Sequence, residues 1–199
     1  MQKLRGRASV GFPRRRIEIC QKVDASRKKH ASLYFYKMEP AITIRDIRPS
    51  DNPYLAKIVK DTLAEFGANH PNTVYFDPTT DKLYELFQKK GAIYFVAEMN
   101  DEIVGGSGIY PTDGLPPDTC ELVKMYLLPQ ARGKGLGRTL IEKSLAYAKE
   151  AGYQNIYLES MPELSKALEV YAQFGFEYLN APMGNSGHTG CQLWMLKKL

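Results

Sequence analysis

The sequence predicts an α/β (α+β) fold built as one domain. Its 199 residues, of which 44% are hydrophobic, are enough to bury one sizeable core. Segments with the apolar pattern of strands are interspersed with segments whose apolar residues recur at helical spacing. The clearest example is 121–152, where a strand runs through a glycine-rich turn into a long amphipathic helix.

The first half of the body contains three predicted strands and two predicted helices. Alternating apolar and polar residues indicate the first strand, and Ser50 or Asp51 can cap the helix that follows it. Residues 67–80 are rich in Pro and Asn, which favours a loop. Asn100 and Asp101 form a tight turn between two strands, which predicts a hairpin. The expected order is strand 42–47, helix 53–66, helix 81–90, strand 92–99 and strand 102–110.

The second half follows a loop rich in Pro and Gly and contains four predicted strands and two predicted helices. Gly152 and Gly175 come directly after helical patterns, as glycines that end helices do. Ser160 and Glu163 have the spacing of a capping box and predict the start of the last helix. The expected order is strand 121–128, a helix from about 136 to Gly152, strand 155–159, a helix from Ser160 to Gly175, strand 176–179, loop 180–189 and strand 191–196.

The net charge of +5 comes from the first 37 residues. This leader contains eleven basic and two acidic residues, whereas the body carries a net charge of −4. We expect 1–37 to be a disordered extension, or to precede the natural start at Met38, and 38–199 to be the folded domain. The leader lacks the apolar segment of a secretory signal. An arm that binds nucleic acid and an organellar targeting peptide are the alternatives.

Several classes of protein and site do not fit the composition. No apolar run approaches the ~18 residues that a membrane span requires. Cys20, Cys120 and Cys191 are too few and too scattered for a disulfide framework or a metal site, and the three histidines are equally dispersed. We therefore expect a protein without a metal, in a reduced, cytoplasmic setting.

The glycine-rich turn before the long helix predicts an anion site. The first N–H groups of a helix have no partner within the helix, and the helix dipole adds positive charge there. Gly133, Gly135 and Gly137 leave the backbone open to a ligand, and Arg132 and Lys134 add charge. The predicted ligand is a phosphate or a diphosphate.

Two common phosphate-binding loops do not fit this turn. A P-loop requires Ser or Thr where Gly135 stands, and a dinucleotide-binding fingerprint requires a third glycine where Arg138 stands. The segment Gln130–Gly135 instead resembles motif A of the GCN5-related N-acetyltransferases (GNAT family), Arg/Gln-x-x-Gly-x-Gly/Ala. A strand before this segment and an amphipathic helix after it strengthen the resemblance.

A second segment, Ala167–Phe176, resembles the family signature A-x-x-L-Y-x-x-x-G-F. The resemblance extends from about residue 41 to the end, which is about four-fifths of the chain. It implies the GNAT acyl-CoA N-acyltransferase fold, a central mixed and mostly antiparallel sheet flanked by helices. The chain departs from the family at Leu164, where an asparagine that contacts the cofactor is common.

The resemblance implies an enzyme that moves an acetyl group from acetyl-CoA to a primary amine of a small molecule, an amino acid or a peptide. Transfer would be direct, within a ternary complex. The pantetheine arm would pair with the backbone of 125–127, where the strand splays from its neighbour, and the diphosphate would lie on the amides of 132–137. The implied cofactor-binding residues are Met125, Tyr126, Leu127, Arg132, Gly133, Lys134, Gly135, Leu136, Gly137 and Arg138.

Two residues match catalytic positions of the family. Tyr171 matches the tyrosine that protonates the departing thiolate, although its position also suits a core aromatic residue. Glu121 matches the glutamate that serves as base in histone-acetylating members, and the alternative is a surface or salt-bridged glutamate, with Lys124 as its partner. A carboxylate buried beside apolar strands would have a raised pKa, which suits a base.

The acceptor is the least determined part of the prediction. Asp77, Asp113 and Asp118 could hold a cationic amine, or could cap turns. We do not expect a membrane or nucleic acid as partner, and the resemblance implies a homodimer as one arrangement. The alternative function is a sensor domain that binds acyl-CoA without catalysis, against which an intact Tyr171 argues.

Overall fold

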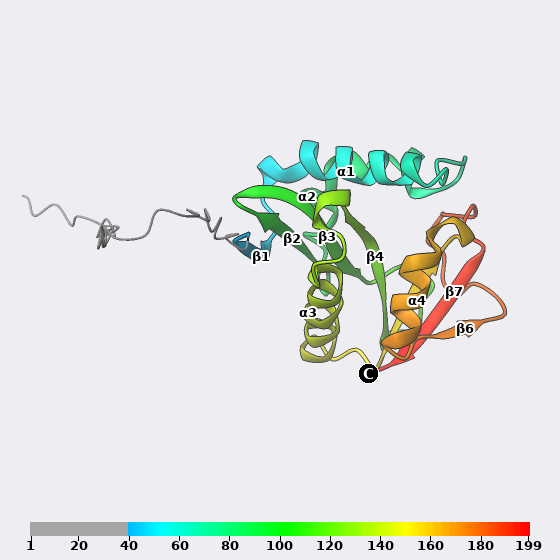
Figure 1. Cartoon of the computed structure of the whole chain (residues 1–199). Coiled ribbons are helices and arrows are strands. Elements are labelled where there is room, and N and C mark those ends of the chain that lie inside the picture. Colours follow the sequence, from blue (N-terminus) through cyan, green and yellow to red (C-terminus); the bar gives the residue numbers. More distant parts are fainter. Residues whose placement is uncertain (1–39) are drawn as a thin grey trace, which may run out of the picture. The chain divides into compact units, whose positions relative to one another are not determined.

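The computed structural model describes residues 40–199, so the leader expected at 1–37 lies outside the described residues. Figure 1 shows the elements along the chain. They are β1 (Ile42–Asp46), α1 (Asn52–Glu65), α2 (Leu83–Leu86), β2 (Ile93–Met99), β3 (Glu102–Tyr110), β4 (Thr119–Leu127), α3 (Leu136–Glu150), β5 (Asn155–Ser160), α4 (Ser165–Gln173), β6 (Glu177–Leu179) and β7 (Leu193–Lys198). No helix in this part of the chain has the length and apolarity needed to cross a membrane.

All seven strands of the described region form one sheet, in the order β1-β2-β3-β4-β5-β7-β6. Every neighbouring pair is antiparallel except β4 and β5, which run parallel. Helix α3 makes the crossover between these two strands, because parallel neighbours cannot be joined by a tight turn. The predicted mixed, mostly antiparallel sheet flanked by helices is confirmed.

The helices cover both faces of the sheet, and the alternation along β2 shows which face each helix covers. Tyr94 and Val96 pack with residues of α1 and α2, whereas Phe95 and Ala97 pack with residues of α3. Helix α4 lies on the same face as α3, because both contribute to the core around Ile141. A fully buried aliphatic side chain such as Ile141 stabilises the fold by about 1.5–3 kcal/mol relative to an exposed one.

Strand β4 contains a β-bulge that reverses its alternation. Lys124 has a φ of +50°, in the left-handed region, and the register against β3 shifts at the same place. Before the bulge Leu122 packs on the α3 side, and after it Met125 does. The side chains of Glu121, Lys124 and Tyr126 therefore share the other face, toward α1.

The order of elements is as predicted, and three local predictions are wrong. The second helix is a single turn, Leu83–Leu86, preceded by a 3₁₀ turn. Neither Ser50 nor Asp51 caps α1 with its side chain, because Asp51 binds Arg45 and the Arg48 amide instead. Helix α4 begins at Ser165.

Ser160 does not open α4, because it belongs to β5, where it pairs with Leu193 of β7. Met161 and a 3₁₀ turn at 162–164 then lead into the helix without any side-chain cap. The capping box predicted from Ser160 and Glu163 is therefore absent. The glycines after α3 and α4 end both helices as predicted, since Gly152 and Gly175 have φ of +91° and +80°.

Candidate active site

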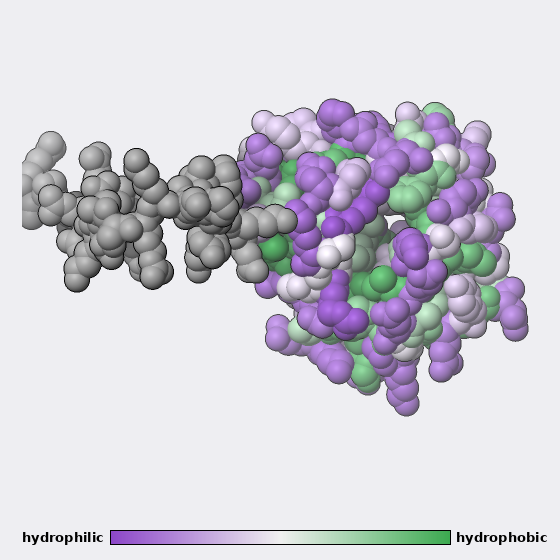
Figure 2. All heavy atoms as spheres, viewed as in Figure 1, coloured by the Kyte–Doolittle hydropathy of each residue, from purple (hydrophilic) through white to green (hydrophobic). Residues whose placement is uncertain are grey.

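Strands β4 and β5 separate after three paired residues and open a cavity. Their parallel ladder runs from Thr119–Asn155 to Glu121–Tyr157 and ends there. A cavity of about 870 Å³ lies beyond it, lined by both strands, α1, α4, the glycine-rich turn and residues 185–188. Figure 2 shows the molecule hollowed in the region between β4 and α4 of Figure 1, with hydrophilic and hydrophobic residues along the rim. The splayed strand edge predicted at 125–127 is present.

The glycine-rich turn presents a run of free amides to this cavity. Gly133 and Gly135 have φ of +71° and +81°, a conformation that glycine adopts at little cost. None of the N–H groups from Gly133 to Arg138 donates to a backbone carbonyl or a side chain among residues 40–199. Three of these residues form the first turn of α3, where the helix dipole favours an anion. The turn therefore fits a diphosphate.

The side chains of the turn differ in how they face the cavity. The Arg132 guanidinium is committed to protein groups, through a bidentate pair with Glu65 (2.6 and 2.7 Å) and a hydrogen bond to the Leu127 carbonyl (2.8 Å). Lys134 is exposed and Leu136 packs in the core, and neither side chain lines the cavity. Arg138 lines it, with its guanidinium 5.0 Å from the centroid of the Phe174 ring.

Residues 125–127 of β4 line the cavity along the edge that β5 leaves free. On the opposite side, Tyr126 and Leu127 keep their ladder partners on β3. Helix α1 adds the hydroxyl of Thr62, which is buried and has no hydrogen-bond partner. Among the side-chain oxygens and nitrogens of residues 40–199 whose own atoms are fully buried, it is the one without a partner, and Thr62 lines the cavity. A ligand group there can supply the missing bond.

Tyr171 of α4 lines the cavity beside β4. Its side chain is buried against Phe176, and its hydroxyl lies 3.6 Å from the sulfur of Met125. Burial raises the pKa of the Tyr171 phenol to about 12, so the hydroxyl keeps its proton at neutral pH. A thioether is a weak acceptor, and a ligand sulfur or oxygen can take its place.

Glu121 is buried at the end of the β4–β5 ladder, where it lines the cavity with 3% of its surface exposed. The Thr112 hydroxyl donates to one of its oxygens. Burial raises the pKa of Glu121 to about 8; the bond from Thr112 opposes this shift, and the charge of Glu159 adds to it. Lys124 is not its salt-bridge partner, because the Lys124 ammonium binds Asp77. The expected burial and raised pKa of Glu121 are therefore present.

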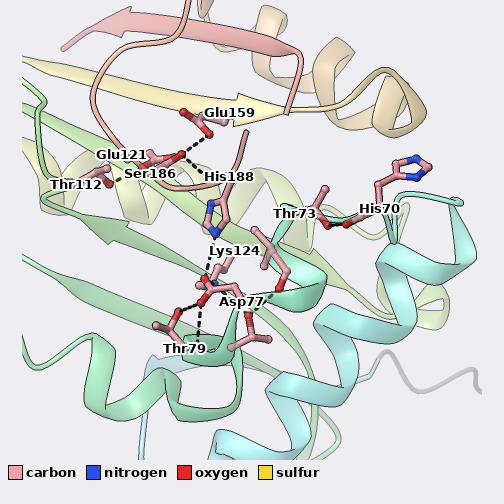
Figure 3. A network of polar contacts seen from close by, with 12 residues as sticks. His70, Thr73, Asp77, Thr79, Thr112, Glu121, Lys124, Glu159, Ser186 and His188 are labelled. Atoms are coloured by element: carbon pink, nitrogen blue, oxygen red, sulfur yellow. Dashed lines mark hydrogen bonds and ion pairs between the residues drawn. The ribbon is translucent and has the colours of Figure 1, made fainter. Parts of the chain in front are cut away.

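A partly buried polar network lies beside Glu121 and joins β4 to two loops (Figure 3). One Asp77 oxygen accepts from the Lys124 ammonium (2.8 Å) and contacts the His188 ring (3.1 Å). Burial alone would raise the pKa of Asp77, but the bond to His188 and the charge of Lys124 hold this pKa well below its usual range. Burial lowers the pKa of Lys124. The other Asp77 oxygen caps a turn by accepting from the Thr79 amide (2.8 Å).

The three aspartates considered either as amine ligands or as turn caps all have partners within the protein. Asp77 is neutralised by Lys124, and Asp113 is 85% exposed and pairs with Lys89. Asp118 accepts a hydrogen bond from the adjacent Thr119 hydroxyl, so its carboxylate serves a local contact at the start of β4.

The structure brings one further carboxylate into the cavity that the sequence prediction missed. Glu159 of β5 accepts hydrogen bonds from the hydroxyls of Tyr157 (2.8 Å) and Ser186 (2.7 Å). It stands two residues after the partner of Glu121 in the parallel ladder, so both face the same side of the sheet. The alternation along 155–160 would have shown this, once the pairing of β4 with β5 was known.

Comparisons with known proteins agree with this geometry. Residues 55–176 match the model of the acetyltransferase (GNAT) family. The chain is 39% identical over 158 residues to the uncharacterised N-acetyltransferase YjgM of Escherichia coli K12, over 78% of this chain and 94% of that protein.

Two solved structures resemble the fold. A GNAT-family acetyltransferase from Staphylococcus aureus Mu50 matches with a TM-score of 0.71 at 20% identity, over 79% of this chain and 99% of that one. The PaiA N-acetyltransferase from Thermoplasma acidophilum, solved with coenzyme A, matches with a TM-score of 0.64 at 18% identity, over 80% and 99%. From the family match and the relative in E. coli, the chain belongs to the GNAT family of acetyltransferases.

Proposed function

We propose that this protein transfers the acetyl group of acetyl-CoA directly to a primary amine. The observation that carries the proposal is the juxtaposition, in one cavity, of a free amide turn, an unpaired strand edge, a protonated tyrosine and a buried glutamate. An amine that meets the thioester in this cavity would react with it directly, so no covalent enzyme intermediate is required. Acetyl-CoA, when bound, supplies the activated acyl group as a thioester.

The backbone would hold most of the cofactor. The amides from Gly133 to Arg138 would bind the diphosphate. The exposed Arg138 side chain lies beside them at the rim, where it forms a long surface ion pair with Glu142 (3.9 Å). The open edge at 125–127 would accept the amides of the pantetheine arm as an added strand. Side chains at these positions are then free to serve the core, as Leu136 does.

Glu121 would act as the general base. An amine must be neutral to attack, and a carboxylate with a pKa of about 8 accepts its proton more readily than an ordinary glutamate does. The bond from Thr112 fixes the orientation of the acid.

Tyr171 would act as the general acid. The C–N bond forms as the C–S bond breaks, and the departing sulfur takes the phenolic proton. The second proton that the attacking nitrogen loses restores the phenol. The net products are one acetamide, one free thiol and one proton, which leaves to solvent from Glu121.

The test is an assay of thiol release from acetyl-CoA with a panel of primary amines, α-amino acids and amino-terminal peptides. We expect release that depends on the amine and falls strongly in Tyr171→Phe. Tight binding of acetyl-CoA without release by any acceptor would instead favour the sensor function.

A further inference from the structure

The cavity holds two carboxylates that no basic side chain neutralises. Its four carboxylates belong to Asp77, Asp113, Glu121 and Glu159. The first two are paired with Lys124 and Lys89. Glu121 and Glu159 form no ion pair within residues 40–199, and their side-chain partners are hydroxyl groups.

These two carboxylates face the same part of the cavity. Glu121 is paired with Tyr157 on the last rung of the parallel ladder, and Glu159 follows two residues later on the same face. Figure 3 shows both beside the loop that carries Ser186. The charge of Glu159 raises the pKa of Glu121, after the larger effect of burial, so the two groups are close enough to repel.

Glu121 also keeps unused hydrogen-bonding capacity in the cavity. It is almost completely buried, and no described residue donates to its second oxygen. Lys124, whose charge also acts on Glu121, is committed to Asp77 and Thr80. A buried carboxylate without a cation is costly, and a cationic ligand removes that cost.

Glu159 is fixed in place as an acceptor. Its two oxygens take hydrogen bonds from different hydroxyls, and the Tyr157 hydroxyl is itself held by the Met183 amide (3.2 Å). A carboxylate has about four acceptor sites, so both oxygens can also bind an ammonium. Such a group suits the recognition of an ammonium that stays protonated during the reaction.

We propose that the preferred acceptor is a small diamine that carries a positive charge at each end. Glu121 takes the proton of the reacting end, and Glu159 binds the ammonium of the far end, which keeps its charge throughout. This inference rests on the proposed acetyl transfer and names the class of acceptor. An α-amino acid fits less well, because its carboxylate would face two unpaired carboxylates.

The test compares three acceptors of similar length that differ at the far end: 1,4-diaminobutane, butylamine and 4-aminobutyrate. We expect kcat/KM to be highest for the diamine, by about tenfold over butylamine, and lowest for the aminobutyrate, since charge-assisted bonds are stronger than neutral ones. Glu159→Gln should remove most of the diamine's advantage and change butylamine much less. The control is Glu177→Gln on β6, an exposed carboxylate that does not line the cavity.

A second readout does not depend on turnover. Calorimetry should detect diamine binding to the protein saturated with coenzyme A, and Glu159→Gln should weaken that binding by about tenfold. Equal kcat/KM for diamine and butylamine, a preference for aminobutyrate, or an unchanged preference in Glu159→Gln would overturn the inference. Diamine binding that depends on Glu159, without acetylated product from any amine, would support the recognition and contradict the proposed transfer.

Discussion

The hydroxyl of Tyr171 lies 3.6 Å from the sulfur of Met125, so that α4 and β4 meet where β4 and β5 have separated. The contact links the second signature segment to the strand that precedes the glycine-rich turn. Since a thioether holds a hydroxyl only weakly, the phenol can turn to a stronger acceptor in the cavity. The buried Glu121 lies four residues earlier on β4.

Tyr171→Phe should lower kcat without lowering the affinity for coenzyme A. The pKa of Tyr171 is raised to about 12, so the acid stays protonated through the assay range, and the loss should be equal across pH. General acid catalysis contributes about 10²–10⁴-fold, which sets the expected size of the loss. Steady-state rates measure kcat, and calorimetry with coenzyme A measures the affinity. Full activity in the variant would leave Tyr171 as a core residue.

Glu121→Gln should remove a step from the pH profile of kcat/KM. The base accepts a proton only when ionised, so wild-type kcat/KM should rise as the pH passes about 8. Glutamine has the same shape but cannot accept the proton, and we expect a loss of about 10²-fold above pH 8. Profiles of both proteins with one amine provide the comparison. A step near 8 that survives in the variant would assign the base elsewhere.

Glu121→Gln should also change how the stability of the folded protein depends on pH. The pKa of Glu121 is raised in the folded protein from 4.5 to about 8, because burial disfavours the charge. Its contribution to stability is therefore complete below about pH 4.5 and is lost as the pH rises through 8. Glutamine does not titrate, so the melting temperature of the variant minus that of wild type should increase between acidic and alkaline pH. A difference that stays constant with pH would show that Glu121 is not buried in solution.

Gly135→Ala should weaken acetyl-CoA binding. Alanine at a φ of +81° is strained by about 1–2 kcal/mol, and relief of the strain would turn an amide away from the diphosphate. Loss of one hydrogen bond corresponds to about 1 kcal/mol, or five- to tenfold in affinity.

The matched control is Gly152→Ala at the other end of α3. This glycine has a φ of +91° and does not line the cavity, and a Cβ added to it would meet no atom within 4 Å. The two variants should therefore lose similar stability, whereas only Gly135→Ala should bind acetyl-CoA more weakly. Equal affinities in both would argue against the turn as the diphosphate site.

Thr62→Val should stabilise the ligand-free protein. The Thr62 hydroxyl is buried without a partner, and removal of an unsatisfied polar group at constant shape should gain about 1 kcal/mol. If the hydroxyl binds a ligand group, the variant should also bind coenzyme A or the acceptor more weakly. Thermal melts with and without ligand separate the two effects. A lower melting temperature without ligand would mean that the hydroxyl already has a partner.

The order of elements could be predicted because the signals that set it are local. Apolar spacing marks α3, and Gly152 and Gly175 end their helices with left-handed backbone. The start of α4 could not be predicted in this way. Ser160 has the sequence of a cap, but pairing with Leu193 holds it in β5, and tertiary contact outweighs the local preference.

The candidate site could be predicted only in part, because some of its features follow from local motifs and others from contacts between distant residues. The amide turn could be predicted from a short motif. The bulge at Lys124, which reverses the alternation of β4, could not, because no local pattern in 119–127 indicates it. Contacts such as that of Asp77 with His188 join residues 111 positions apart. Such distant contacts, and the commitment of Arg132 to Glu65, depend on how whole elements pack.

The most direct test of the proposed acetyl transfer is the product balance of a single reaction of acetyl-CoA with a primary amine, followed by mass spectrometry. We predict one acetylated amine for each coenzyme A thiol released, with both products reduced together in Tyr171→Phe. Thiol released without acetylated amine, or acetyl-CoA that binds and remains intact with every amine, would contradict it.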